Sequence, residues 1–454
     1  MTDAPLQSPS GQVRDVAIVG GGAAGVLVAL HLLRAPGPRP RVRLIEPRPQ
    51  LGEGIAYSTP YPAHLLNVRA GNMSAFPAEP ADFVRFAAKE TTDDGDPPLA
   101  QRYLPRGLFA RYLRAALADS SPPADLHVRD TVVDIAGDGP FTLRLGSGAS
   151  LAADAVVLAT GNAPRPPIAD VAARVPAWDY DAVAAIGADE DVAIVGSGLS
   201  MVDVAVSLAA NGHRGRIDVF SRHGLLPLAH HAHGGAHGDA DALHPLGLRA
   251  RLRKLRAEAA ALAAEGQPWQ WLMDRLRPHG RALWQSLSPV EQARFLRHAV
   301  RFWDIHRHRI APDVAAQLDP LLHSGQLRVH AARVMAVKDA EGGVALHYRR
   351  RGEGTDVLHR ADRLVDATGI ETRLRAMPDS LLARLAARGC AAPGPHGLGI
   401  AVDADGHVID AHGRAQARLR AIGTPRLGVE WETTAIPDLR VQAEAIAAGL
   451  RAAG

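Results

Sequence analysis

The chain has 454 residues, of which 47% are hydrophobic and 22% charged. This composition is typical of a globular protein, and the length exceeds what one hydrophobic core usually supports, so we expect two domains. The 51 basic residues nearly balance the 48 acidic ones, giving a net charge of +3. Because no basic block interleaved with aromatic residues occurs, nucleic acid is excluded as the main partner.

Cys390 is the only cysteine. A disulfide framework and a Cys-x-x-Cys redox pair are therefore excluded within one chain. The first dozen residues lack the charged and apolar regions of a signal peptide, and no apolar stretch reaches the roughly 18 residues of a membrane span. We expect a cytoplasmic protein without a membrane partner.

A glycine-rich loop follows a short apolar run near the N-terminus. Residues 15–19 predict a buried strand, and residues 24–33 predict a helix whose N-terminus points at bound phosphates. Gly20 permits the tight turn, Gly22 lets the backbone approach a pyrophosphate, and Gly25 lets the helix pack on the strand. The pattern predicts a dinucleotide site.

An acidic residue follows this loop at the distance that adenosine recognition requires. Residues 42–45 predict a second strand, which ends in Glu46. A carboxylate there would accept the ribose hydroxyls of the adenosine. Strand, loop, helix and acid together are much more specific than the glycines alone.

A second glycine loop lies about 175 residues later. Residues 191–195, 200–211 and 216–220 predict its strand, helix and second strand. Met201 replaces the third glycine, so helix packing must differ there. The second strand leads into Ser221 and Arg222, where the first unit has an acid. Replacing the acid with an arginine admits a 2′-phosphate on the ribose, so NADPH is favoured over NADH.

The tripeptide Ala-Thr-Gly occurs twice, each time after an apolar strand. The copies include Thr160 with Gly161, and Thr368 with Gly369. Small residues let the chain pass close to a cofactor. Three prolines after the first copy predict a crossing between domains.

Between the first unit's second strand and residue 77, the chain is too rich in glycine and polar residues for a core element, and we expect a long loop beneath a flavin. A helix begins at Arg106, which is either a cofactor or substrate contact or a solvated helix start. Residues 441–450 predict a closing helix, which either aims its N-terminal amides at the flavin's pyrimidine edge or only caps the fold.

Residues 246–322 are helical in pattern and contain four of the six tryptophans, which indicates a packed helical insertion. Within it, Asp304, His306 and Arg309 are candidate catalytic residues that could relay protons or fix an anionic substrate. A salt-bridged, solvated helix face is the alternative. The histidine-rich run at residues 230–237 lacks cysteines and ligand spacing, so we expect no metal and a loop over the nicotinamide, in which His231 could touch substrate.

Several runs carry a resemblance to a known family. They are Gly52-x-Gly54-x-Ala56-Tyr57, His64-Leu65-Leu66-Asn67-Val68, the block at 303–309 and Glu430-Trp431-Glu432-Thr433-Thr434. They resemble a largely uncharacterised family of bacterial FAD/NAD(P)-binding proteins, related to the flavin-containing and N-hydroxylating monooxygenases. The resemblance covers nearly the whole chain.

The resemblance implies an α/β fold, namely a two-dinucleotide-binding (Rossmann-like) flavoprotein fold with a helical insertion. It implies FAD in the first unit and NAD(P)H in the second, with an FAD-binding domain formed by residues 1–167 and 361–454. Residues 168–360 then form the NAD(P)H-binding domain, with the insertion at about 246–322.

Two departures limit the resemblance. The Phe-x-Gly-x-x-x-His fingerprint of Baeyer–Villiger enzymes is missing before the second unit, where the chain has Arg174 to Tyr180 without histidine. Disulfide-reductase relatives end a late strand in Gly-Asp, whereas here Gly423 precedes Thr424, so ribityl contacts must be rearranged.

The resulting hypothesis is a single-component flavin monooxygenase that uses FAD and NADPH. It would oxygenate a small nucleophile, in an N-hydroxylation type of reaction, through a C4a-(hydro)peroxyflavin. Its partners would be a small-molecule substrate and dioxygen, and a homo-oligomer stays open. The alternatives are an NAD(P)H-dependent reductase that passes electrons to a quinone or another acceptor, and a non-catalytic nucleotide-sensing flavoprotein.

The expected cofactor contacts fall into three groups. In the first unit and its loops they are Gly20, Gly22, Ala23, Ala24, Gly25, Glu46, Gly54, Tyr57, Asn67, Val68, Met73, Arg106, Val132, Thr160 and Gly161. In the second unit they are Gly196, Ser197, Gly198, Leu199, Ser200, Ser221, Arg222, Thr368 and Gly369. Near the C-terminus they are Glu432, Thr433, Thr434 and Ile436.

Overall fold

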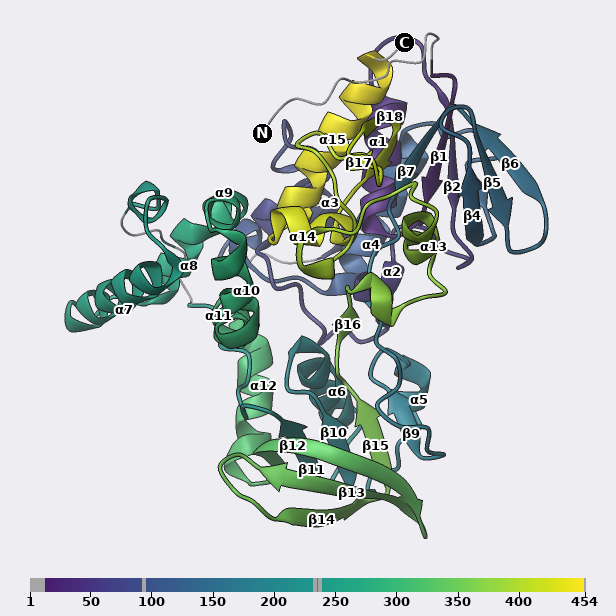
Figure 1. Cartoon of the computed structure of the whole chain (residues 1–454). Helices are drawn as coiled ribbons and strands as arrows, with labels where there is room; N and C mark the ends of the chain where they lie inside the picture. Colours follow the sequence, from purple (N-terminus) through teal and green to yellow (C-terminus); the bar gives the residue numbers. More distant parts are fainter. Residues whose placement is uncertain (1–12, 92–94, 232–234, 236–238, 453–454) are drawn as a thin grey trace.

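The computed structural model describes residues 13–91, 95–231, 235 and 239–452. Two sheets lie in separate parts of the molecule, and a group of helices extends to one side (Figure 1). None of the described helices is long and apolar enough to span a membrane.

The first sheet combines strands from both ends of the chain. Its order is β17 (His407–Ile409), β18 (Ala415–Ala421), β7 (Ala155–Leu158), β1 (Asp15–Val19), β2 (Arg41–Ile45) and β3 (His127–Val128). Neighbouring strands from β18 to β3 run parallel, whereas the edge strand β17 is antiparallel. The central strands β1 and β7 are almost fully buried, which explains their continuous apolar sequences.

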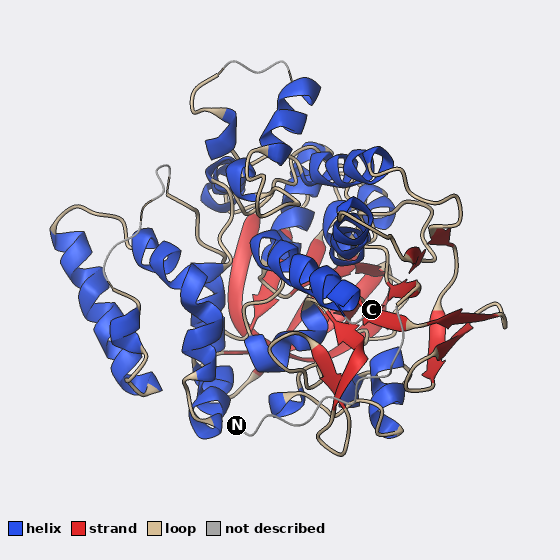
Figure 2. Ribbon diagram, turned by 90° about the horizontal axis from the view of Figure 1, so that it is seen from above, coloured by secondary structure: helices blue, strands red, loops and turns tan. Residues whose placement is uncertain are grey.

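Helices cover this sheet (Figure 2). Helix α1 (Ala23–Arg34) packs against α15 (Ile436–Ala452) and α4 (Arg106–Asp119), so the closing helix completes the N-terminal core. Helix α3 (Asp82–Glu90) packs on α4. An antiparallel ribbon of β4 (Val132–Ala136), β5 (Phe141–Leu145) and β6 (Ser150–Ala153) adjoins the sheet.

The second sheet repeats the parallel arrangement around the second glycine loop. Its order is β14 (Asp356–Ala361), β13 (Gly343–Arg350), β12 (Leu327–Ala340), β11 (Ile217–Ser221), β10 (Val192–Val195), β15 (Arg363–Asp366) and β9 (Arg174–Pro176). Helix α6 (Leu199–Ala210) packs between α5 (Tyr180–Ala184) and α12 (Pro312–His323).

Two chain crossings connect the sheets. They pair as an antiparallel ribbon of β8 (Ala163–Pro164) and β16 (Ile370–Glu371). The ribbon lies next to the predicted domain limits, and the limits themselves stay predictions.

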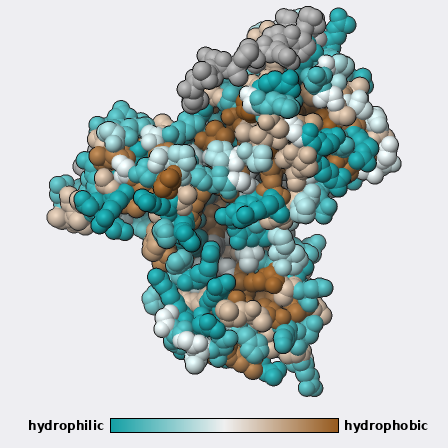
Figure 3. Space-filling model, viewed as in Figure 1, coloured by the Kyte–Doolittle hydropathy of each residue, from teal (hydrophilic) through white to brown (hydrophobic). Residues whose placement is uncertain are grey.

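The helical insertion is present where the sequence predicts it. It contains α7 (Leu248–Ala264), α8 (Gln270–Leu276), α9 (Gly280–Gln285), α10 (Pro289–His298) and α11 (Val300–Arg307). Helix α7 projects away from both sheets (Figure 1). In the same view, hydrophobic side chains gather on the insertion among hydrophilic ones (Figure 3).

Two expectations from the sequence need correction. The closing helix starts at Ile436, five residues before the predicted 441, because Pro437 in a first helical turn needs no hydrogen-bonded N–H. The segment before residue 77 is not excluded from the core, since Leu66, Ala70 and Met73 are buried in it. Its apolar residues are spaced irregularly, so neither strand nor helix periodicity reveals them.

Replacing Gly25 with alanine tests the first glycine loop. A Cβ atom at Gly25 would lie 1.9 Å from the carbonyl oxygen of Gly20, so strand and helix must separate. We expect Gly25→Ala to lose most bound FAD and to destabilise the fold by about 1–3 kcal/mol.

Flavin absorbance and thermal unfolding of the purified protein measure both effects. Gly354→Ala is the matched control, because a Cβ atom there meets nothing within 4 Å. Equal flavin content in the two variants would contradict the role assigned to Gly25.

Candidate functional site

The first glycine loop forms a cradle at the carboxyl edge of the first sheet. Gly20 has a φ of +107°, and a Cβ atom on it would lie 2.3 Å from the carbonyl oxygen of Ala159. Gly22 is the N-cap of α1, and the nearest atom to a Cβ there is 3.5 Å away, on Gly54. The first turn of α1 contains no acidic residue, so its free N–H groups suit a phosphate.

Glu46 closes one side of this cradle. Its carboxylate accepts hydrogen bonds from the backbone N–H groups of Gly21, at 2.9 Å, and Arg48, at 3.1 Å. These bonds fix the carboxylate beside the loop at the end of β2. Carboxylate oxygens accept more than one bond each, so the predicted ribose contact remains available.

Several predicted contacts on the loop up to residue 77 pack inward. Met73 and Val68 lie in the core around α1, and Tyr57 packs on Phe109 with 4.9 Å between ring centroids. Burial raises the pKa of the Tyr57 hydroxyl above its usual range. The backbone carbonyl of Asn67 accepts a hydrogen bond from His230 at 3.0 Å. Their contacts with a cofactor stay predictions.

Arg106 has a structural role that the sequence did not reveal. Its two terminal nitrogens donate to the two carboxylate oxygens of Asp203 at 2.6 and 2.8 Å, and Nε donates to the carbonyl of Leu65 at 3.0 Å. Asp203 belongs to α6, so this bidentate pair joins the two dinucleotide units. The predicted cofactor contact of Arg106 stays untested.

His64 lies in the same junction and is buried. Its Nδ1 atom is 2.6 Å from the hydroxyl of Thr59, and its Nε2 atom is 2.9 Å from both the Asp203 carbonyl and the Ser207 hydroxyl. Burial lowers the pKa of His64. The ring therefore ties the loop of residues 46–77 to α6 as a neutral group. We call this segment the flavin-side loop, because the sequence predicts that it lies beneath a flavin.

The second glycine loop borders a cavity of about 510 Å³. All nine residues predicted for the second unit line it, from Gly196 to Ser200, Ser221 with Arg222, and Thr368 with Gly369. A Cβ atom at Gly196 would lie 2.1 Å from the Ala367 carbonyl oxygen, whereas one at Gly198 would meet nothing within 4 Å. Gly198 thus leaves open the space that a pyrophosphate needs.

Met201 explains the missing third glycine. Its side chain is fully buried in the core formed by α6 and the second sheet. With glycine at this position, α6 could pack closer to the sheet. Here the long, unbranched side chain of Met201 fills the space between them.

Four arginines line the same cavity: Arg165, Arg222, Arg301 and Arg333. Arg301 donates to the Ser197 carbonyl at 2.9 Å. Arg222 and Arg333 are exposed and have no carboxylate partner in the part of the chain that the structure describes. Such guanidinium groups suit the phosphates of an anionic nucleotide.

The three candidate catalytic residues do not converge. Asp304 lines the 510 Å³ cavity, and burial raises its pKa to about 6 although Arg301 opposes the shift. His306 packs edge-on against Trp269, with ring centroids 4.8 Å apart. Arg309 forms an ion pair with Asp274. Asp304 and His306 lie on different faces of α11, and Arg309 follows its C-terminal end. The catalytic role of the three residues stays a prediction.

In the C-terminal motif, residues 430–434, the side chains of Glu432 and Thr433 form buried hydrogen bonds and an ion pair. Glu432 accepts from Trp303 at 2.8 Å and pairs with Arg307 at 2.9 Å. Burial alone would raise the pKa of Glu432, but Arg307 and His308 lower it below its usual value. The Thr433 hydroxyl donates to Glu430 at 3.0 Å.

The remaining predicted contacts surround the flavin-side edge. Thr434 is exposed, and Ile436 is buried at the start of α15. Thr160 and Gly161 follow β7 at the same edge as Gly20. Val132 begins β4 and packs against the core beside the first sheet. Their roles toward a cofactor stay predictions.

A larger cavity has a volume of about 1040 Å³, in the segment that the sequence predicts to build a substrate pocket. It lies in the helical insertion, and its lining includes Phe302, Trp303 and His306 of α11. Arg249, Arg253, Arg256 and Arg294 also line it. The clustering of tryptophans was the only sequence signal for it.

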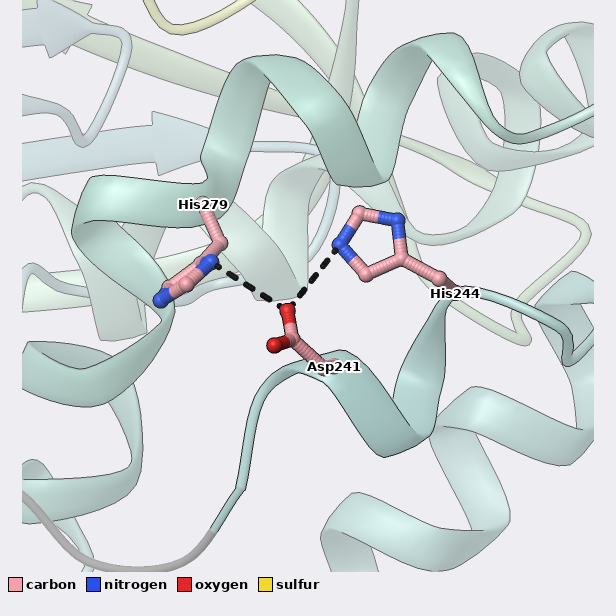
Figure 4. A group of neighbouring side chains, drawn as sticks. All are labelled: Asp241, His244 and His279. Carbon is pink, nitrogen blue, oxygen red and sulfur yellow. Dashed lines mark ion pairs between the residues drawn. The ribbon is translucent and has the colours of Figure 1, made fainter.

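Candidate metal ligands occur away from the predicted contacts. Asp241 lies between His244 and His279, with oxygen to nitrogen distances of 3.8 and 3.9 Å (Figure 4). The Asp241 side chain is 80% exposed, and exposed groups of this kind are common without an ion. The expectation that the chain binds no metal stays a prediction. In the histidine-rich run, His233 and His237 lie outside the described residues.

Comparisons with known proteins agree with this geometry. Residues 17–163 match the model of an FAD-NAD(P)-binding family, which confirms the dinucleotide-binding prediction for the first unit. A search of curated protein sequences gives no match. The chain has the two-dinucleotide-binding flavoprotein fold predicted from its sequence.

Solved structures share this fold over nearly their whole length. An ornithine N-hydroxylase from Kutzneria sp. 744 is 15% identical, with a TM-score of 0.67 and coverage of 96% of this chain and 99% of that chain. An L-lysine 6-monooxygenase from Pseudomonas syringae is 15% identical, with a TM-score of 0.67 and coverage of 97% and 99%. A bacillithiol disulfide reductase from Bacillus cereus is also 15% identical, with a TM-score of 0.54 and coverage of 97% and 99%.

Asp304 provides a pH-dependent test of the nucleotide cavity. As the pH rises through about 6, its carboxyl group ionises and places a negative charge in a cavity suited to phosphates. We expect Asp304→Asn to bind NADP+ about fivefold more tightly than the unmodified protein at pH 8, and equally at pH 5.

Titration of protein fluorescence with NADP+ at the two pH values measures the difference. The ligand's own phosphate titrates equally in both proteins, so only the ratio of their dissociation constants matters. A ratio that does not change with pH would show that Asp304 does not face the bound nucleotide.

Proposed function

We propose that this protein is an NADPH-dependent flavin monooxygenase that oxygenates a small nucleophilic substrate, in an N-hydroxylation type of reaction. The main observation in support of this proposal is a fold with two dinucleotide units in a chain whose only cysteine is Cys390. The fold is shared by hydroxylases and by a disulfide reductase. Dithiol exchange within one chain needs two cysteines, so a single cysteine favours the hydroxylase class over dithiol chemistry.

The residues of the first cradle fit FAD. Side chains are absent at Gly20 and Gly22, where a pyrophosphate would approach, and Glu46 lies beside the loop, where its carboxylate would accept ribose hydroxyls. FAD, when bound, accepts a hydride from the nicotinamide and reacts with dioxygen. The chain itself binds and orients both nucleotides and excludes water from their meeting point.

The second cradle fits a nucleotide that carries an extra phosphate. Arg222 follows β11 at the position where an acid would otherwise accept the ribose hydroxyls, and Arg333 lines the same cavity. Two unpaired guanidinium groups there favour a 2′-phosphate over a hydroxyl. This arrangement supports NADPH as the hydride donor.

Removing these guanidinium groups tests the preference for NADPH. We expect the double variant Arg222→Ala, Arg333→Ala to lose at least about 100-fold in kcat/KM for flavin reduction by NADPH, since each lost charge-assisted bond costs about 1.5–3 kcal/mol. Reduction by NADH should change less than about threefold.

Anaerobic stopped-flow absorbance with each nucleotide measures the rates. Arg350→Ala is the control, because this arginine lies on β13 and pairs with Glu353 outside the cavity. Equal losses with NADPH and NADH would contradict recognition of the 2′-phosphate.

Spectroscopy of the flavin tests the proposed reaction class. NADPH should bleach the bound FAD without oxygen, and admitting oxygen with an amine substrate should yield hydroxylated product in proportion to the NADPH consumed. Release of hydrogen peroxide alone, with every amine tested, would favour the alternative of a reductase that serves a quinone or another acceptor. Failure of NADPH to bleach FAD would leave only the nucleotide-sensing alternative.

A further inference from the structure

Three arginines of the helical insertion form a buried arginine cluster beside the C-terminal motif. Arg277 lies just after α8, Arg307 ends α11, and Arg309 follows two residues later. The side chains of Arg307 and Arg309 are only 10% and 4% exposed. Buried guanidinium groups need either carboxylates or hydrogen-bond acceptors.

The cluster has more donors than the protein satisfies. Arg307 pairs with Glu432, and Arg309 pairs with Asp274. Four buried nitrogens still lack an acceptor: Nη2 of Arg277, Nε of Arg307, and Nε and Nη1 of Arg309. Native structures rarely leave buried donors unpaired, so such a concentration indicates a missing acceptor.

Three carboxylates lie close to the cluster, so the unpaired nitrogens are left by geometry and not by a lack of negative charge. Glu432 and Asp274 pair with Arg307 and Arg309, and Asp438 interacts with Arg277 and Arg307 without a hydrogen bond to either. Burial raises the pKa of Asp438 to about 6, so its charge is lost as the pH falls below that value. Burial and then Arg309 lower the pKa of His230 to about 3, which keeps this ring neutral. The Arg277 side chain forms no hydrogen bond or ion pair with the described residues.

The buried arginine cluster contacts two segments that are expected to surround the flavin. Glu432, the partner of Arg307, directly precedes Thr433 and lies four residues before the start of α15 at Ile436. His230, which interacts with Arg309 and Arg277, donates to the backbone carbonyl of Asn67 on the flavin-side loop. In Figure 1 the insertion helices lie beside the start of α15. A ligand held by the cluster would therefore lie near the reacting ring.

We propose that the buried arginine cluster binds a carboxylate of the substrate, which makes the substrate a small carboxylic acid, such as an amino acid, that carries the nucleophilic group. Carboxylates accept several hydrogen bonds in the planar geometry that guanidinium groups offer. That the bound carboxylate belongs to a substrate rests on the proposed function. Carboxylate binding at the cluster can be measured whether or not the protein turns over.

Equilibrium binding to the FAD-loaded protein tests the inference. The probes are benzoate, succinate and L-alanine, each compared with the corresponding amide, which lacks the carboxylate. We expect one or more of these carboxylates to raise the midpoint of thermal unfolding and to bind at least about tenfold more tightly than its amide.

Variants locate the binding. Arg277→Gln should weaken carboxylate binding about tenfold or more with unchanged FAD content, and Arg277→Lys should restore part of it. Arg256→Gln is the matched control, since this exposed arginine belongs to the same insertion but lines the 1040 Å³ cavity. It should bind carboxylates as the unmodified protein does.

Four outcomes would overturn the inference. They are no binding of any carboxylate, equal binding of the amides, a comparable loss in Arg256→Gln, and loss of FAD instead of carboxylate affinity in Arg277→Gln. The last would assign the cluster to the flavin. Anaerobic bleaching by NADPH is recorded on the same samples, so failure of the proposed function appears as unbleached FAD whether or not carboxylates bind.

Discussion

Both dinucleotide units depend on one steric constraint, the absence of a Cβ atom where a glycine loop passes a second strand. Gly20 approaches the carbonyl of Ala159, and Gly196 approaches that of Ala367 in the same way. Each alanine begins one of the two Ala-Thr-Gly copies, so the repeated tripeptide and the repeated glycine form one unit of structure. Any side chain at either glycine would separate the parallel strands that position the N-termini of α1 and α6, where the sequence predicts the phosphates.

The relative position of the two units rests on buried polar contacts together with apolar packing, in which Leu65 and Tyr103 contact the core of the second unit. Arg106 and Asp203 form a bidentate pair across the junction, and His64 adds hydrogen bonds to α6. Removing charges from water is costly, so such a pair holds only with good geometry and full hydrogen bonding, which the Leu65 carbonyl completes. The junction thereby fixes how two bound nucleotides would face each other, which hydride transfer requires.

Local patterns account for what the sequence predicted and what it missed. Both glycine loops and their strands could be predicted because turn, strand and helix signals are adjacent in the chain, as in residues 15–33. The Arg106–Asp203 pair could not, since its partners are 97 residues apart and neither local sequence identifies the other as its partner. The titratable block at 303–309 was identified as one group because it is continuous in sequence, but a helix turns about 100° per residue and distributes such neighbours around its axis.

Helix α11 consequently separates two cavities. Arg301 and Asp304, three residues apart, face the nucleotide cavity, whereas Phe302, Trp303 and His306 face the 1040 Å³ cavity. A helix with its side chains is about 10 Å across, so a ligand confined to the larger cavity could not reach a nicotinamide in the smaller one. The buried arginine cluster lies at the C-terminal end of α11, where this partition ends and the flavin-side loop and α15 meet. The proposed oxygenation needs the substrate close to the flavin, so this end of the helix fits that reaction better than the larger cavity does.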